Sequence, residues 1–166
     1  MIKTLLRRII DYKYLKYRKG KILDLGCGDG SLMIGDCIGV DIDSKQIKKA
    51  KKEGKKVFLG NAEKIQFNSQ FDTITMIYLL HHSTNPEKIL KNAYRHLNKG
   101  GNLLVVESSK EGLYWENHKF KHEIKKEWLR KQLKKLGLKI IREFSHFGRT
   151  EGLKFSKSYI VIAKKI

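Results

Sequence analysis

The chain has 166 residues, of which 36 are Lys or Arg and 17 are Asp or Glu, so its formal net charge is +19. A chain of this length forms one domain that buries roughly 70% of its unfolded surface without needing disulfides. It contains neither the ~20 apolar residues of a membrane span nor the apolar run of a signal peptide. The composition predicts a cytoplasmic protein with free thiols at Cys27 and Cys37.

The positive charge has two interpretations. It can mark a surface that binds polyanions, because each phosphate that a protein neutralises releases counterions. However, 29 of the basic residues are Lys and only 7 are Arg, and they are spread over almost every segment. Since Arg is favoured for bidentate contacts to phosphate, the charge can also be a property of solvated surfaces alone. Both interpretations stay open.

A first buried strand is predicted at 21–25, with Asp24 near its end and a turn from Gly26 to Gly30 directly after it. Glycine stands at every second position of this turn, which lets the backbone bend sharply and approach a ligand closely. The spacing differs from the Gly-x-Gly-x-x-Gly of dinucleotide sites, and no Gly-Lys-Ser/Thr follows. A nicotinamide-dependent dehydrogenase is therefore disfavoured.

Short runs rich in Ile, Val and Leu are typical of buried parallel strands. Such runs predict strands at 37–41, 56–59, 71–77 and 102–107. Helices are expected between these strands, including about one turn in the ten residues between Gly30 and Asp41.

Three helices have readable ends. Ser44 is the predicted N-cap of a helix at 45–52, and Asn85 precedes a helix that starts at Pro86 and carries an apolar stripe as far as Leu97. Another helix is predicted at 123–136.

The last two strands, predicted at 138–144 and 157–163, have no helix between them and should form an antiparallel hairpin. The order of elements predicts an α/β fold, a Rossmann-like doubly wound sheet of seven strands that is mostly parallel with one antiparallel strand. We expect a single domain at 1–166. Its parts are a helical cap at 1–20, a cofactor-binding core at 21–107, and a substrate-side segment with a helix and the hairpin at 108–166.

Asp41 stands at the end of the second strand. A carboxylate there can accept two hydrogen bonds from a ribose diol, as the acidic residue of dinucleotide sites does. Asp43 is the competing candidate, although together with Ser44 it is better placed to cap the next helix.

Further motifs follow the later strands. They are Gly60 to Phe67, Tyr78 to His82, and Leu97 to Val105, which contains Gly100 and Gly101. In order with the glycine turn and Asp41, they resemble the successive motifs of the type 11 methyltransferase domain, a family of class I S-adenosylmethionine-dependent methyltransferases. The resemblance covers about residues 21–107, and the final hairpin also fits the family.

The resemblance implies S-adenosyl-L-methionine as the cofactor. The residues that would border its methionine end, with the acid facing the ammonium group, are Asp24, Gly26, Cys27, Gly28 and Tyr78.

The resemblance also implies an adenosine site. Asp41 would bind the ribose hydroxyls, and Ile42 would lie against the adenine. Asn61 stands where relatives usually have an Asp, and its amide oxygen can still accept a bond from the adenine amino group. Ala62 would offer its backbone N–H to the ring.

Methyl transfer from a sulfonium needs a general base only if the acceptor must lose a proton. His81 and His82 are the nearest candidates, since neutral imidazole accepts protons near pH 7. A structural or substrate-packing role is the alternative for both. We expect no metal site.

Substrate determinants should lie in loops at the carboxyl ends of the later strands. The candidates are His82, Tyr114, Trp115, His118, His146 and Phe147. Aromatic side chains among basic ones can stack on a nucleobase or form a lid over a small apolar acceptor.

The sequence therefore predicts an S-adenosylmethionine-dependent methyltransferase that acts on a small molecule. One alternative is an RNA or tRNA methyltransferase, which the net charge of +19 would suit. Another is a non-catalytic cofactor-binding subunit of a complex, which the short segment before residue 21 would suit. The acceptor atom and the oligomeric state stay open.

Overall fold

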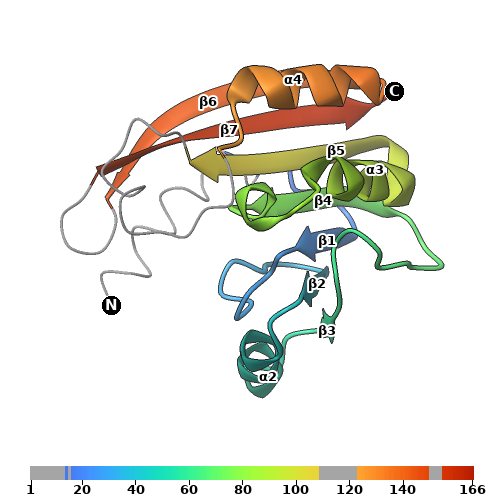
Figure 1. Cartoon of the computed structure of the whole chain (residues 1–166). Coiled ribbons are helices and arrows are strands. Elements are labelled where there is room, and N and C mark those ends of the chain that lie inside the picture. The colour runs from blue at the N-terminus through green and yellow to red at the C-terminus, as the bar shows by residue number, and fades with distance from the viewer. Residues whose placement is uncertain (1–13, 15, 109–122, 150–154) are drawn as a thin grey trace.

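The computed structural model describes residue 14 and residues 16–108, 123–149 and 155–166, with the side chains of 146–149 and 155–157 left aside. Seven strands form one sheet in the order β3-β2-β1-β4-β5-β7-β6 (Figure 1). The strands are β1 (Ile22–Leu25), β2 (Cys37–Asp41), β3 (Val57–Leu59), β4 (Phe71–Ile77), β5 (Leu97–Ser108), β6 (Leu138–Arg149) and β7 (Phe155–Lys165).

Strand β7 is antiparallel to both of its neighbours, β5 and β6, and the other pairs are parallel. This confirms the doubly wound, mostly parallel sheet with its hairpin. The described helices are α2 (Ser44–Lys52), the 3-10 turn η1 (Leu80–His82), α3 (Pro86–His96) and α4 (Lys126–Lys135). Within the described residues, no helix has both the length and the apolar character that crossing a membrane requires.

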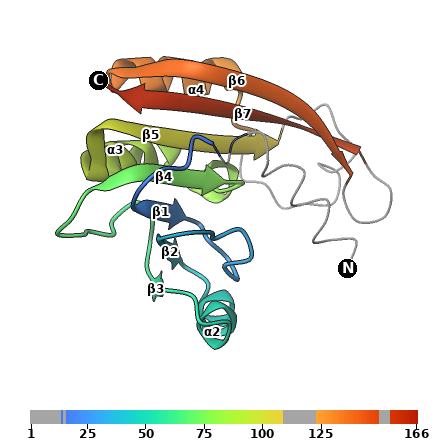
Figure 2. The ribbon, with the colours of Figure 1, turned by 180° about the vertical axis from the view of Figure 1, so that it is seen from behind.

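Helices lie on both faces of the sheet. Helices α3 and α4 cover one face, and Figure 2 shows them behind the sheet when the molecule is turned around. Leu23 and Ile38 belong to the core beneath them. The neighbouring residues Ile22 and Cys37 point to the other face, where they pack with Ile47 of α2. The alternation along β1 and β2 thus serves two cores, which is why both faces of these strands are mostly apolar, with Asp24 and Asp41 as the charged exceptions.

The helix ends are set by local hydrogen bonds. Asn85 caps α3 as predicted, because its side-chain oxygen accepts the N–H of Lys88 at 3.0 Å. The prediction of Ser44 as the cap of α2 is wrong. Asp43 is the cap, because its carboxylate accepts the N–H of Lys45 at 2.8 Å, and Ser44 is the first helical residue.

Two other helix boundaries also differ. Helix α3 ends at His96, one residue before the last residue of the predicted apolar stripe, because Leu97 already pairs with Phe71 as the first residue of β5. Helix α4 begins at Lys126 rather than at residue 123.

Two expected helices are absent, one between β1 and β2 and the other between β3 and β4. Between β1 and β2 the chain turns back through short bonds instead, such as Gly30 N–H to the carbonyl of Cys27 at 3.0 Å. In the second connection, the side-chain amide of Asn92 in α3 donates to the carbonyls of Ala62 and Ile65 at 3.0 and 2.9 Å. These carbonyls are therefore satisfied without a helix.

Asp72 ties the segment before β1 to the first residues of β5. One carboxylate oxygen accepts the backbone N–H of Lys21 at 3.0 Å, and the other accepts the side-chain N–H of Asn98 at 2.8 Å. The Lys21 N–H and the Asn98 amide stabilise the charged carboxylate, so they lower the pKa of Asp72 below its ordinary value.

Asp72→Ala should lower the free energy of unfolding by about 1–3 kcal/mol at neutral pH, because two donors lose their acceptor. A lowered folded-state pKa means that this stabilisation is fully present above the ordinary Asp pKa of ~4 and is lost as the pH falls through the lowered value. Urea unfolding at several pH values measures the difference in unfolding free energy between the wild type and Asp72→Ala. This difference should be present at pH 7 and shrink on acidification. A difference that stays constant down to acid pH would contradict this account.

Candidate functional site

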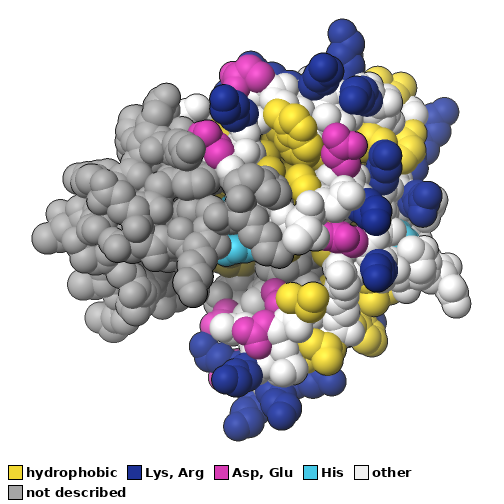
Figure 3. Space-filling model, in the orientation of Figure 1, with side chains coloured by type: hydrophobic (Ala, Val, Ile, Leu, Met, Phe, Trp, Pro, Cys, Tyr) yellow, Lys and Arg dark blue, Asp and Glu magenta, His cyan; other side chains and the backbone are white. Residues whose placement is uncertain are grey.

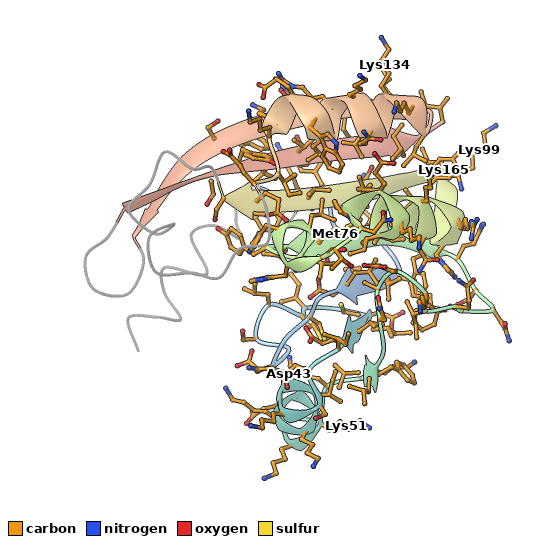
Figure 4. All side chains as sticks on the ribbon, in the orientation of Figure 1. Asp43, Lys51, Met76, Lys99, Lys134 and Lys165 are labelled. Carbon is orange, nitrogen blue, oxygen red and sulfur yellow. The ribbon has the colours of Figure 1, made fainter. Side chains whose placement is uncertain are left out.

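A hollow lies at the carboxyl ends of β1, β2, β3 and β4. The residues that line it are Gly26, Val40, Asp41, Ile42, Gly60, Asn61, Ala62, Glu63, Leu79, His82, Ser83, Thr84 and Ile89. The chain order of the sheet reverses between β1 and β4, and ligands of open α/β sheets bind at such a switch point. Asp43, just beyond β2, lies at the start of α2 (Figure 4).

The glycine turn is held against β2. The backbone N–H groups of Gly26 and Cys27 donate to the carbonyl of Val40 at 2.8 and 3.1 Å. Gly26 has φ +76°, and a Cβ there would come within 2.8 Å of the Leu79 side chain. Because both conditions exclude a larger residue, this glycine is required where the turn borders the hollow.

Asp41, which lines the hollow, joins the glycine turn to the segment that starts α2. One carboxylate oxygen accepts the N–H of Gly28 at 2.8 Å, and the other accepts the N–H of Asp43 at 2.8 Å. Each oxygen of an ionised carboxylate has a second lone pair. The side chain can therefore hold the glycine turn and still accept hydrogen bonds from a ligand.

Asp24 lies beneath the turn and does not line the hollow. It is 3% exposed, and it accepts the hydroxyl of Thr75 on β4 at 2.5 Å. Cys27 packs its side chain beside Met33 and Cys37 in the α2-side core. Both cysteines are free and buried, and burial raises the pKa of both thiols, that of Cys37 to about 12. The predicted contacts of Asp24 and Cys27 with a cofactor stay predictions.

The predicted adenine side forms the other wall of the hollow. The side-chain oxygen of Asn61 accepts the N–H of Glu63 at 2.8 Å, and the next residue, Ala62, is buried. Ile42 is 72% exposed at the rim, so it offers an apolar face to a planar ring. The structure thus brings Asp41, Ile42, Asn61 and Ala62 together around one hollow.

The wall that follows β4 contains the two predicted histidines, which have different surroundings. His82 is exposed and lines the hollow, whereas His81 is 3% exposed. The Nδ1 atom of His81 lies 2.5 Å from Oε2 of Glu107 at the end of β5, and Oε1 of Glu107 accepts the N–H of Leu80 at 2.7 Å. The two imidazole centroids are 4.1 Å apart.

Glu107 and Ser83 are site residues that the sequence reasoning missed. Glu107 is fully buried, and its only sequence signal is an acid at the end of an apolar run. Ser83 donates its hydroxyl to Glu63 at 2.9 Å, which connects the wall after β4 to the loop after β3. Sequence spacing predicts neither the contact of Glu107 with His81 nor that of Ser83 with Glu63.

Tyr78 does not line the hollow. It has φ +55°, a left-handed conformation that is uncommon for a residue with a side chain. Its hydroxyl lies 3.1 Å from the hydroxyl of Ser158 on β7, and its ring packs against the core on the face away from α3 and α4. Backbone outliers of this kind cluster at functional sites. Its contact with the methionine end of a cofactor stays a prediction.

The remaining substrate-side candidates lie outside the described residues or have only their backbones described. Tyr114, Trp115 and His118 lie outside the described residues, and only the backbone of His146 and Phe147 is described, within β6. In the described ranges, no group of three or more His, Cys, Asp or Glu side chains is placed to hold a metal ion.

Comparison with known proteins gives a family. The model of a methyltransferase domain family matches residues 23–105. The ubiquinone/menaquinone biosynthesis C-methyltransferase UbiE of Enterobacter sp. is 35% identical over 112 residues, which are 56% of this chain and 45% of that protein. An uncharacterized protein of Methanocaldococcus jannaschii is 33% identical over 90 residues, 52% of this chain and 44% of that protein. The chain spans a little under half the length of these curated relatives.

Solved structures share the fold. A SAM-dependent methyltransferase from Archaeoglobus fulgidus has a TM-score of 0.80 at 20% identity, covering 98% of this chain and 94% of that chain. The magnesium protoporphyrin IX methyltransferase of Synechocystis, with bound SAM, has a TM-score of 0.73 at 17% identity, covering 99% and 80%. With half of its length matched by the family model, the chain belongs to the methyltransferase domain family and has the fold of the class I S-adenosylmethionine-dependent methyltransferases.

Proposed function

We propose that this protein is an enzyme that transfers the methyl group of S-adenosylmethionine to a small molecule. The observation that carries the proposal is Asp41, whose carboxylate stands at the hollow between the glycine turn and the loop with Asn61. S-adenosylmethionine supplies a methyl group on a sulfonium, a leaving group that is already activated. The protein then contributes mainly by positioning the reactants and excluding water.

The residues at the hollow fit this cofactor. Asp41 accepts the ribose hydroxyls through the lone pairs that Gly28 and Asp43 leave available. Ile42 lies against the adenine face, and Asn61 and Ala62 border its edge. Asp24, buried below the turn, supplies the negative charge that a methionine ammonium group requires. The two buried thiols, which form no disulfide, suit a reducing compartment, so we place the enzyme in the cytoplasm.

Two observations support a small-molecule acceptor. The name of UbiE refers to the biosynthesis of ubiquinone and menaquinone, and the name of the Synechocystis enzyme refers to magnesium protoporphyrin IX. These compounds are small molecules. In addition, the described residues that line the hollow include Asp41 and Glu63 but no Lys or Arg. Such a lining is poorly suited to guide a phosphate backbone.

An RNA acceptor is the second candidate, because the net charge is +19. The charge is dispersed, however, as Figure 3 shows for Lys and Arg over the upper, right and lower parts of one face. Lys51 lies on α2, whereas Lys99, Lys134 and Lys165 lie near the far ends of α3 and α4 (Figure 4). An RNA substrate predicts affinity that falls steeply with salt, and a flat salt dependence would exclude it.

Isothermal titration with S-adenosylhomocysteine tests the cofactor directly. We expect saturable binding, and no binding at millimolar ligand would overturn the proposal. Incubation with tritiated S-adenosylmethionine and cell extract, with RNA separated from small molecules, then tests the acceptor. Label in the small-molecule fraction supports the proposed substrate class, label in RNA supports the second candidate, and label in neither indicates a non-catalytic subunit.

A further inference from the structure

Lysine is concentrated on α2 and on the turn that follows it. Seven of the 13 residues at 44–56 are Lys, and Glu53 is the only acid among them. These lysines are exposed except for Lys55, which is half-buried. Lys49 pairs with Asp29 at 2.7 Å, whereas no other ion pair between described residues involves this segment. The segment therefore presents a dense positive charge that neighbouring acids leave largely uncompensated.

The packing of α2 decides where its lysines point. Ile47 is buried in the core beside Val57 of β3. Lys48 and Lys52 stand one helical turn apart on the side of the helix that faces solvent. Lys51 lies on the flank of α2 toward β3 (Figure 4). The outward face of α2 and its flank beside the sheet edge are thus both basic.

Exposed apolar side chains gather at the same end of the molecule. Strand β3 is an edge of the described sheet, because it pairs with β2 alone, and its Phe58 and Leu59 are 44% and 57% exposed. Ile34 is also exposed, and the carbonyl of the residue before it accepts the Lys55 ammonium group at 3.4 Å. Figure 3 shows apolar and basic side chains together at the lower end of the molecule, where α2 and β3 lie in Figure 1. We call this the α2–β3 surface, and its members are Ile34, Lys48, Lys51, Lys52, Phe58 and Leu59.

Helix α4 is also basic but has different surroundings. Its Arg130 pairs with Glu143, and none of the exposed large apolar side chains of the described residues lies on it. Lys131 and Lys135 are exposed and stand one helical turn apart, as Lys48 and Lys52 do on α2. The two helices therefore separate the effect of charge alone from that of charge beside apolar side chains.

We propose that the α2–β3 surface docks on a lipid bilayer that carries anionic headgroups. A cluster of about four to eight basic residues on a helix is typical of proteins that bind such lipids. The ammonium groups of lysine are strongly hydrated point charges, so they lie among the phosphates. Phe58 and Leu59 enter the boundary between the headgroups and the acyl chains. Because α2 buries its own apolar face in the core, β3 supplies this contact.

Two other partners fit the surface less well. A nucleic acid would attract the lysines, but residues 44–56 contain no Arg, which is favoured for bidentate contacts to phosphate. A phosphate backbone also gains little from an exposed aliphatic side chain such as Leu59. A second copy of this chain could cover the apolar side chains, but it would bring two lysine clusters together. An anionic bilayer offers negative charge and apolar depth at one surface.

Sedimentation of the full chain with vesicles tests the proposal. Vesicles of phosphatidylcholine alone are compared with vesicles in which about a third of the lipid is phosphatidylglycerol. We expect binding to the anionic vesicles only. This binding should weaken strongly at about 1 M NaCl, where the Debye length is about 3 Å. Binding to both kinds of vesicle alike, or to neither, would overturn the proposal.

A charge-matched pair of double variants locates the surface. One replaces Lys48 and Lys52 of α2 by Gln, and the other replaces Lys131 and Lys135 of α4 by Gln. Each lysine near an anionic surface contributes about fivefold to the partition coefficient. The α2 variant should therefore bind the anionic vesicles about 25-fold more weakly, whereas the α4 variant should bind them like the wild type. Equal losses would show that net charge alone is responsible and would overturn the proposal.

Leu59→Ser tests the apolar contact. It should weaken vesicle binding by about fivefold, a fraction of what burying a leucine contributes, whereas Ile166→Ser, at another exposed apolar residue, should have no effect. All of these variants change exposed side chains, so their urea unfolding should match that of the wild type. Vesicle binding that Leu59→Ser leaves unchanged would overturn the proposal. Tighter binding to a single-stranded RNA oligonucleotide that the α2 variant loses would overturn it in favour of a nucleic acid.

Discussion

Asp41→Ala should weaken the binding of S-adenosylhomocysteine by at least about 30-fold, which corresponds to about 2 kcal/mol. The physical reason is that hydrogen bonds to a charged group contribute about 1.5–3 kcal/mol when they are removed. The variant also loses the bond from Gly28 that closes the glycine turn onto β2. Isothermal titration measures the change directly.

Asp43→Ala is the matched control, two residues away. Its carboxylate caps α2 through the N–H of Lys45, so the variant should lose about 1 kcal/mol of stability with unchanged affinity. If Asp43→Ala weakened binding and Asp41→Ala did not, the ribose would be bound by the other acid.

Gly39→Val should lower the free energy of unfolding by about 3 kcal/mol, at the upper end for overpacking in a core. Gly39 is buried in the middle of β2, where the turn after β1 packs directly on the strand. A Cβ at this position would lie 2.6 Å from Sγ of Cys27 and 2.7 Å from Sδ of Met33. Real Cβ atoms do not approach other atoms so closely, so the turn must shift. Urea unfolding measures the loss.

A double-mutant cycle with Met33→Ala identifies the cause. In the wild-type background Met33→Ala should destabilise by about 2 kcal/mol, because it leaves a cavity. In the Gly39→Val background it should cost about 1 kcal/mol less, since the valine then occupies the space of the sulfur. If the two changes in unfolding free energy simply add, contact with Met33 is not what requires glycine at position 39.

Strands were predicted well from the sequence. Strands β2 and β4 have the predicted bounds, Cys37–Asp41 and Phe71–Ile77. Both are flanked by other strands and serve a core on each face, so nearly all of their positions are buried, although β4 also carries Asp72, Thr73 and Thr75.

Helices between the strands were predicted less well. The alternation of strands suggested a helix at every crossover, but the segments 26–36 and 60–70 return without one. In the segment 60–70, the carbonyls of Ala62 and Ile65 accept hydrogen bonds from the side chain of Asn92, which lies 30 residues after Ala62. The absence of a helix thus depends on a partner far along the chain, which local propensity does not contain.

The sequence by itself determined the glycine turn, Asp41 and the order of motifs, because these depend on residues that are neighbours in the chain. Only the tertiary structure decided that Glu107 meets His81, 26 residues away, and that Tyr78 meets Ser158, 80 residues away. Such pairs follow from strand order and register, in which β4 lies beside β5 and β5 beside β7. Register is fixed by how whole strands bury their apolar faces, and no single motif contains that information.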